Sequence, residues 1–303
     1  MGVFFALGSA ALFGLGNVFI RRGQRAYTAD NGAVVTAVIN VIILGTVTVG
    51  LLLRNPIVWT AEGVTAFIVA GVLTTGLGRF TNMAAVRDLG PSRAGVYRVS
   101  APVFTAGAAY ILLGERLTAN EAVGAAVVLA GLWVLTTEAR IRTPGPWTRA
   151  ATPEPVVSVP LRGIGFGLAS ALCYGLGFVV RKVGLGHMPA VVPAAALGAL
   201  AGLATNFIIA WAGRGWADTV RTALREVPLW FKLAGLTTSV AVLGQFSSLS
   251  LLSASVVSVL LATEPLWILV LGRLLFPGQE RVTARVIISA IVIVAGVGVM
   301  FVL

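Results

Sequence analysis

The feature that most constrains this chain is an internal repeat. Its opening apolar stretch, residues 2–23, returns at residues 163–184 with small and apolar residues at matching positions. The matching pairs include Phe5 and Phe166, Leu7 and Leu168, Ser9 and Ser170, Gly14 and Gly175, Gly16 and Gly177, Asn40 and Asn206, Pro102 and Pro265, and Glu115 and Glu280. Because these matches keep the same order in both halves, we interpret them as an internal duplication.

The composition identifies the surroundings in which these two halves fold. Hydrophobic residues make up 57% of the chain and charged residues 11%, and the mean hydropathy is +0.95. Soluble domains carry about 25% charged residues, so a soluble protein is excluded. The apolar segments run near the roughly twenty residues that a membrane-crossing helix needs and show no alternation of period two, which argues against a β-barrel.

We therefore predict an all-α integral membrane protein with ten transmembrane helices, arranged as two five-helix repeats. An odd number of spans in each half inserts the second half upside down, which is the inverted-repeat plan of secondary transporters. The predicted spans are 2–20, 33–53, 64–86, 93–113, 119–137, 163–180, 190–212, 230–252, 254–276 and 283–303. No basic segment or cleavage site follows Met1, so we expect the first span to be retained.

The predicted organisation is a first repeat at 1–138, a linker at 139–162 and a second repeat at 163–303. The linker carries Pro144, Pro146, Pro153, Pro155 and Pro160, a composition typical of a loop.

Basic residues are concentrated in the loops after odd-numbered spans: Arg21, Arg22, Arg25, Arg87, Arg93, Arg140, Arg142, Arg149, Arg214, Arg221, Arg225 and Arg281. The alternate loops contain Arg54, Arg116, Arg181 and Lys182. By the positive-inside rule the first set is cytoplasmic, which predicts a multi-pass protein of the plasma (inner) membrane with both termini outside. The net charge of +11 is scattered over short loops, so we expect contacts with lipid headgroups and no nucleic-acid binding.

Intramembrane polar residues indicate the candidate site. Glu264 lies about ten residues into its span, where a carboxylate needs a partner, a proton or water. Pro102 and Pro265 interrupt their spans, which predicts helix kinks beside a central cavity; a purely structural kink is the alternative.

Arg79 and Arg98 lie inside the third and fourth spans, and snorkelling of each arginine to the interface is the alternative to a site. We predict that the two guanidinium groups and Glu264 form a positively charged site. Further predicted lining residues are Asn17, Asn82, Tyr97, Tyr174, Gln245 and Trp267.

Catalytic patterns are missing from the sequence. The only histidine, His187, is predicted to lie in a loop, the single cysteine Cys173 lies in an apolar span, and no spacing of metal ligands occurs. We expect neither an enzyme nor a cofactor.

Taken together, these motifs resemble the EamA-like ten-helix branch of the drug/metabolite transporter superfamily. The resemblance rests on Pro102, on the turn Gly114-Glu115-Arg116-Leu117-Thr118 with Gly124 and Gly131, and on the second copy at Glu264-Pro265, 278–283 and Gly296. Phe13-Gly14 and Tyr174-Gly175 replace the Trp-Gly element usual in the family. The resemblance implies alternating access, frequent export of amino acids, other metabolites or toxic compounds, and a cavity between the first, third, fourth, sixth, eighth and ninth helices. It also implies cytosolic termini, whereas the loop charges favour the opposite orientation, so both orientations stay open.

Our first hypothesis is a proton-coupled exporter of a small metabolite, such as an amino acid or an organic anion. Arg79 and Arg98 would hold the anionic group, and Glu264 would exchange protons. The alternatives are a flippase for a lipid-linked anionic headgroup and a non-transporting membrane scaffold in which Glu264 pairs with Arg98. The expected partners are the substrate, protons and membrane lipids, with the chain a monomer or a weak homodimer.

Overall fold

The computed structural model describes residues 1–23, 29–54, 57–89, 94, 97–142, 161–212, 229–276 and 284–302, and in these ranges it contains helices and no strand. The α-helices are α1 (Gly2–Gly23), α2 (Ala29–Leu52), α3 (Ala61–Gly71), α4 (Arg79–Leu89), α6 (Ala101–Leu113), α7 (Ala119–Arg142), α8 (Leu161–His187), α9 (Val191–Ala212), α11 (Leu229–Leu251), α12 (Ala254–Leu261), α13 (Glu264–Leu275) and α14 (Ala284–Val302). A π-helical segment, η1 (Val72–Gly78), joins α3 to α4.

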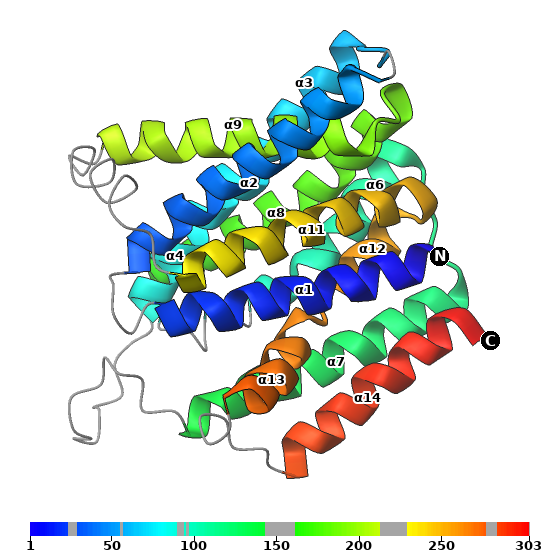
Figure 1. Cartoon of the computed structure of the whole chain (residues 1–303). Coiled ribbons are helices and arrows are strands. Elements are labelled where there is room, and N and C mark those ends of the chain that lie inside the picture. Colours follow the sequence, from blue (N-terminus) through cyan, green and yellow to red (C-terminus); the bar gives the residue numbers. More distant parts are fainter. Residues whose placement is uncertain are drawn as a thin grey trace.

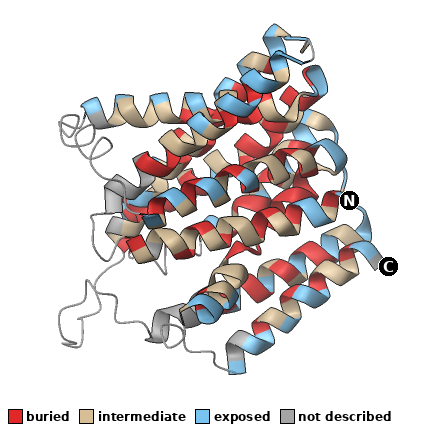
Figure 2. Cartoon of the chain, in the orientation of Figure 1, coloured by how far each residue is buried: buried red, intermediate tan, exposed pale blue. Residues whose placement is uncertain are grey.

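Six stretches of the described residues are long and apolar enough to cross a bilayer. They are Gly2–Ile20, Val35–Leu52, Ala61–Val86, Leu161–His187, Val191–Ile209 and Ala254–Leu275. Large apolar side chains are exposed on the outside of the bundle, among them Ile111, Ile208 and Val294. Buried residues face the interior, as Figure 2 shows. This distribution suits a protein whose outer surface contacts lipid.

The helices pack around α1 and α8, the first helices of the two predicted repeats. α1 packs against α11, α12 and α13, and α8 packs against α3, η1, α4 and α6. α7 and α14 pair with each other, and both chain termini lie at the same end of the bundle (Figure 1).

The duplication seen in the sequence recurs in this packing. Equivalent glycines of α1 and α8 lie against equivalent residues of the opposite half. The equivalent contacts are Gly14 with Trp267 and Gly175 with Phe104, Gly16 with Thr238 and Gly177 with Thr74, and Gly23 with Phe231 and Gly184 with Phe67. Glycine at these positions lets two helix backbones approach closely.

Small residues at every fourth position form the packing face of each of these two helices. Gly2, Ala6, Ala10 and Gly14 are all buried in α1, and so are Gly163, Gly167, Ala171 and Gly175 in α8.

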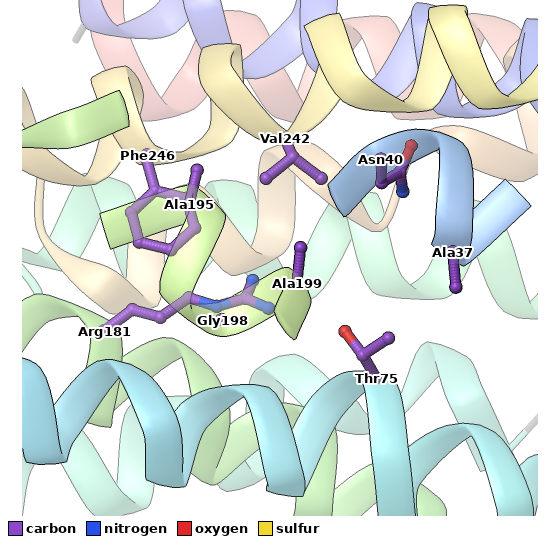
Figure 3. A pocket seen from close by; sticks show the side chains of 9 residues that line it. All are labelled: Ala37, Asn40, Thr75, Arg181, Ala195, Gly198, Ala199, Val242 and Phe246. Carbon is purple, nitrogen blue, oxygen red and sulfur yellow. The ribbon is translucent and has the colours of Figure 1, made fainter. Parts of the chain in front are cut away.

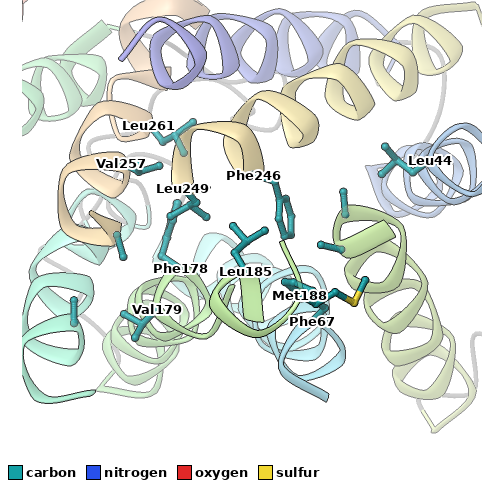
Figure 4. Close-up of a cluster of buried hydrophobic side chains, with 14 of the residues drawn as sticks. Leu44, Phe67, Phe178, Val179, Leu185, Met188, Phe246, Leu249, Val257 and Leu261 are labelled. Carbon is teal, nitrogen blue, oxygen red and sulfur yellow. The ribbon is translucent and has the colours of Figure 1, made fainter. Parts of the chain in front are cut away.

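Apolar side chains from α2, α3, α8, α11 and α12 hold the centre of the bundle (Figure 4). Phe67 and Phe246 meet edge to face, with ring centroids 6.0 Å apart. This cluster fixes α8 between the two halves and so positions the polar residues of α8 described below.

The structure corrects one predicted boundary that matters for function. The span predicted at 163–180 continues as α8 to His187, so Arg181, Lys182 and His187 lie in a helix and not, as predicted, in a loop. The prediction ended the span early because two adjacent cations were interpreted as loop charges. Each of them has an internal partner: Lys182 donates to the carbonyls of Leu249 and Leu252 at the end of α11.

Two other predicted spans are discontinuous. The span predicted at 254–276 is divided into α12 and α13, and α6 begins at Ala101 inside the span predicted at 93–113. Most of the predicted linker and the second-copy motif at 278–283 lie outside the described residues.

Candidate functional site

The candidate site forms around the break between α12 and α13. Glu264 is the first residue of α13 and Pro265 the second. A proline suits the first turn of a helix, because the backbone N–H that it lacks has no partner within the helix there. The positive end of the α13 dipole therefore lies inside the bundle, where it favours a carboxylate. Pro102 occupies the equivalent second position of α6.

The carboxylate of Glu264 is shared by two donors from other helices. The Asn17 side-chain amide in α1 donates to Oε1 at 2.6 Å, and Arg98 Nη2 donates to Oε2 at 3.0 Å. The Glu264 side chain is 11% exposed and the Arg98 side chain 45% exposed. This ion pair is thus buried on its acidic side and more exposed on its basic side.

Two further residues complete what we call the Glu264 cluster, which consists of Asn17, Arg79, Arg98, Tyr174 and Glu264. The Arg98 guanidinium carbon lies 5.6 Å from the centroid of the Tyr174 ring, the geometry of a cation–π contact. Arg79 begins α4 directly after the π-helical segment and lies near enough to Arg98 for the two positive charges to repel each other. Two guanidinium groups and one carboxylate give the cluster a net positive charge.

The other predicted lining residues are not members of the Glu264 cluster. Asn82 is half-buried on α4, one turn after Arg79. Tyr97 packs on α8 at Gly167, and Trp267 packs on α1 at Gly14. Their contacts with these glycines are packing contacts between helices.

Gln245 lies in a second polar cluster, centred on Arg181. The Arg181 side chain is buried, and the residue is 8% exposed. Its Nη1 donates to Gln245 Oε1 at 2.9 Å and its Nη2 donates to Thr74 Oγ1 at 2.6 Å. The guanidinium carbon lies 5.2 Å from the centroid of the Phe246 ring. Within the described part of the chain, Arg181 Nε has no hydrogen-bond partner.

A cavity of about 40 Å³ lies beside Arg181. Figure 3 shows the guanidinium extending into it from one side. The other lining residues are Ala37, Asn40, Thr75, Ala195, Gly198, Ala199, Val242 and Phe246. A cavity needs a volume of about 10–15 Å³ to hold one ordered water, so this cavity has room for a few waters or one compact chemical group.

Tyr174 of the Glu264 cluster and Arg181 lie on nearly the same side of α8. Arg181 follows Tyr174 by seven residues on α8, which places it on nearly the same helix face and about 10 Å further along the axis. The Arg98 guanidinium contacts the ring of Tyr174. Arg98, through its contact with Tyr174, and Arg181 therefore lie along the same side of α8.

Sequence reasoning missed Arg181, although its spacing from Tyr174 was available as a signal. A second signal is that these polar residues occupy positions at which the two repeats differ. The repeat alignment pairs Asn17 with Phe178, Arg181 with Ile20, Glu264 with Ala101 and Arg98 with Leu261. The duplication supplies the framework, and the departures from it supply the charges.

Comparison with known proteins gives a family and a fold. The model of the EamA-like transporter family matches residues 1–137 and 161–302. A crystal structure described only as that of a protein matches with a TM-score of 0.72 and 17% sequence identity, over 99% of this chain and 95% of its own. At that identity the match concerns the fold alone. No curated protein sequence matches the chain.

Proposed function

Because the chain belongs to the EamA-like transporter family, which is part of the drug/metabolite transporter superfamily, we propose that it is a proton-coupled exporter of small zwitterionic metabolites such as amino acids. Its ten spans form two inverted five-helix repeats, and the Glu264 cluster lies between them. The shared Glu264 carboxylate, held by Asn17 and Arg98 at the α12–α13 break, is the observation that carries this proposal.

A zwitterion fits this cluster because it can replace the internal ion pair without changing the net charge. In the free protein Arg98 pairs with Glu264. A substrate carboxylate takes the place of Glu264 beside Arg98, with Arg79 adding further attraction. The substrate ammonium group then takes the place of Arg98 beside Glu264. Buried charges must be paired, and this exchange keeps both protein charges paired.

Proton coupling follows from competition at Glu264. The ionised Glu264 carboxylate binds the substrate ammonium group. The protonated carboxyl carries no negative charge and therefore releases the ammonium group. Proton and substrate thus occupy the site in turn, which is the requirement for exchange of one against the other across the membrane. An inward proton gradient then drives the substrate outward.

The test is transport by purified protein in proteoliposomes. The wild-type chain should accumulate an amino acid against its concentration gradient when a pH gradient is imposed. Glu264→Gln should lose both this accumulation and the exchange of labelled for unlabelled amino acid, because its neutral side chain, like the protonated carboxyl, does not bind the substrate ammonium group. Glu62→Gln changes an exposed carboxylate in the first turn of α3 and is the matched control. Accumulation that persists in Glu264→Gln under the pH gradient would remove Glu264 from the mechanism.

The Arg98–Glu264 pair is also what the scaffold alternative requires, so the pair alone does not separate the two functions. A scaffold exchanges no metabolite, and amino acids do not change its melting temperature through this cluster. Exchange of labelled amino acid by the wild-type chain excludes it. The flippase alternative instead predicts transport of a lipid-linked headgroup and no exchange of free amino acid.

A further inference from the structure

Arg181 carries a buried positive charge that no described carboxylate neutralises. Among the described residues its side-chain hydrogen bonds go to the neutral groups of Gln245 and Thr74. An isolated charge in a low-dielectric interior is costly unless it is paired, and one of its five N–H donors, on Nε, has no partner in the described chain. The guanidinium lines the adjoining cavity, so its charge is available there for an anion.

The adjoining cavity has the size and lining for one small anionic group. Its volume of about 40 Å³ has room for one compact group. Asn40 and Thr75 line it with polar atoms, and Ala195, Ala199 and Val242 give it apolar walls. Figure 3 shows the Arg181 guanidinium reaching the cavity close to Gly198 and Ala199.

We propose that the Arg181 cavity binds the carboxylate group of the transported substrate as a second station on its path. This inference rests on the proposed function, which supplies the substrate, and it adds a second site for the substrate carboxylate besides Arg98 in the Glu264 cluster. The planar guanidinium fork matches a carboxylate by two parallel hydrogen bonds. A halide cannot use this fork, and a tetrahedral phosphate is larger and carries more charge than one guanidinium balances.

The position of the cavity supports a transfer between two stations. Arg181 lies about 10 Å beyond Tyr174 along α8, and Arg98 stacks on the ring of the same tyrosine. A carboxylate released by Arg98 therefore meets the next cation two helical turns further, past one aromatic ring. The helices α2 and α9 line this second station and do not contribute to the Glu264 cluster.

The experiment is equilibrium binding to the purified full chain, measured by isothermal titration calorimetry. The probes are sodium propionate, propionamide and sodium chloride. Propionamide keeps the shape of propionate without its charge, and chloride keeps the charge without the two carboxylate oxygens. Propionate should bind, and Arg181→Gln should weaken its binding by about tenfold or more, as expected for loss of a charge-assisted pair. Arg162→Gln, which changes an exposed arginine paired with Asp88, is the matched control and should bind propionate as the wild type does.

A second variant keeps the proposal testable if Arg181→Gln fails to fold. Ala199→Val retains every hydrogen bond of Arg181 and fills the cavity with two methyl groups, so it should also weaken propionate binding by about tenfold. Binding that survives in either variant, or chloride binding equal to that of propionate, would overturn the carboxylate site.

The two proposals fail separately. Amino-acid transport driven by a pH gradient without propionate binding at Arg181 would overturn the second station alone. If propionate binding depends on Arg181 but transport driven by the pH gradient is unchanged in Glu264→Gln, the proton mechanism alone is overturned.

Discussion

Replacing the glycine of α8 or α1 that lies against the opposite half should destabilise the protein, whereas replacing an unobstructed glycine of the same helix should not. A Cβ on Gly175 would lie 2.7 Å from the Cβ of Phe104 and 2.9 Å from the carbonyl oxygen of Ala101. A Cβ on Gly14 would lie 2.8 Å from the Cβ of Trp267. Optimal contacts between carbon atoms are about 3.5–4.0 Å, so either alanine forces two helices apart.

The magnitude follows from two opposing terms. Overpacking a tight contact costs about 1–3 kcal/mol, because the obstructing atoms are the backbone or the Cβ of another helix and cannot rotate away. Alanine in place of glycine favours a helix by about 1 kcal/mol. Gly8 and Gly165 have nothing within 4 Å of an added Cβ. Gly8→Ala and Gly165→Ala should therefore gain the helix preference of alanine without the cost of overpacking.

The assay is thermal unfolding in detergent, followed by the fluorescence of the tryptophans. The free energy of unfolding of Gly14→Ala should be about 1–3 kcal/mol lower than that of Gly8→Ala in the same helix. The free energy of unfolding of Gly175→Ala should be lower than that of Gly165→Ala by the same amount. Equal melting temperatures for an alanine variant and its control would refute the close packing of α1 and α8 on the opposite half. A large loss in only one of the two halves would refute their equivalence.

Three further substitutions test individual contacts. Thr74→Val keeps the side-chain shape but removes an acceptor of Arg181, and the buried donor left behind should lower the free energy of unfolding by about 1–3 kcal/mol; unchanged thermal stability would contradict this role. Glu115→Gln removes the charge that accepts hydrogen bonds from the first backbone N–H groups of α12, and should cost about 1 kcal/mol in the same assay. A variant as stable as the wild type would show that this end of α12 does not need the carboxylate. Asn17→Ala removes the amide that orients Glu264, and should raise the KM of amino-acid exchange by about tenfold, or 1.4 kcal/mol; an unaltered KM would place Asn17 outside the site.

Much of the framework was predictable from the sequence because it depends on local composition and on the repeat. Apolar length predicts a helical membrane protein, and the paired Pro102 and Pro265 lie where α6 and α13 begin. A carboxylate inside an apolar span, as at Glu264, indicates a polar site whatever the packing around it. These are properties of single segments, which a sequence records directly.

The partners within the site were less accessible, because they depend on how distant segments pack. Gln245 was predicted through its equivalence with Arg79, but its side-chain oxygen accepts a hydrogen bond from Arg181. Arg181 itself was assigned to a loop, since a cation near the end of an apolar run has the same hydropathy in either setting. Only the packing of α8 against η1 and α11 distinguishes a buried guanidinium from a loop charge.

The most direct test of the central claim is a recording of luminal pH in proteoliposomes while an amino acid is added outside. The proposed exchange predicts that amino acid entering wild-type vesicles drives protons out, so the lumen becomes more alkaline, and that Glu264→Gln vesicles show no such change. Amino-acid accumulation by the wild-type protein with a constant luminal pH would contradict the exchange of proton and substrate at Glu264.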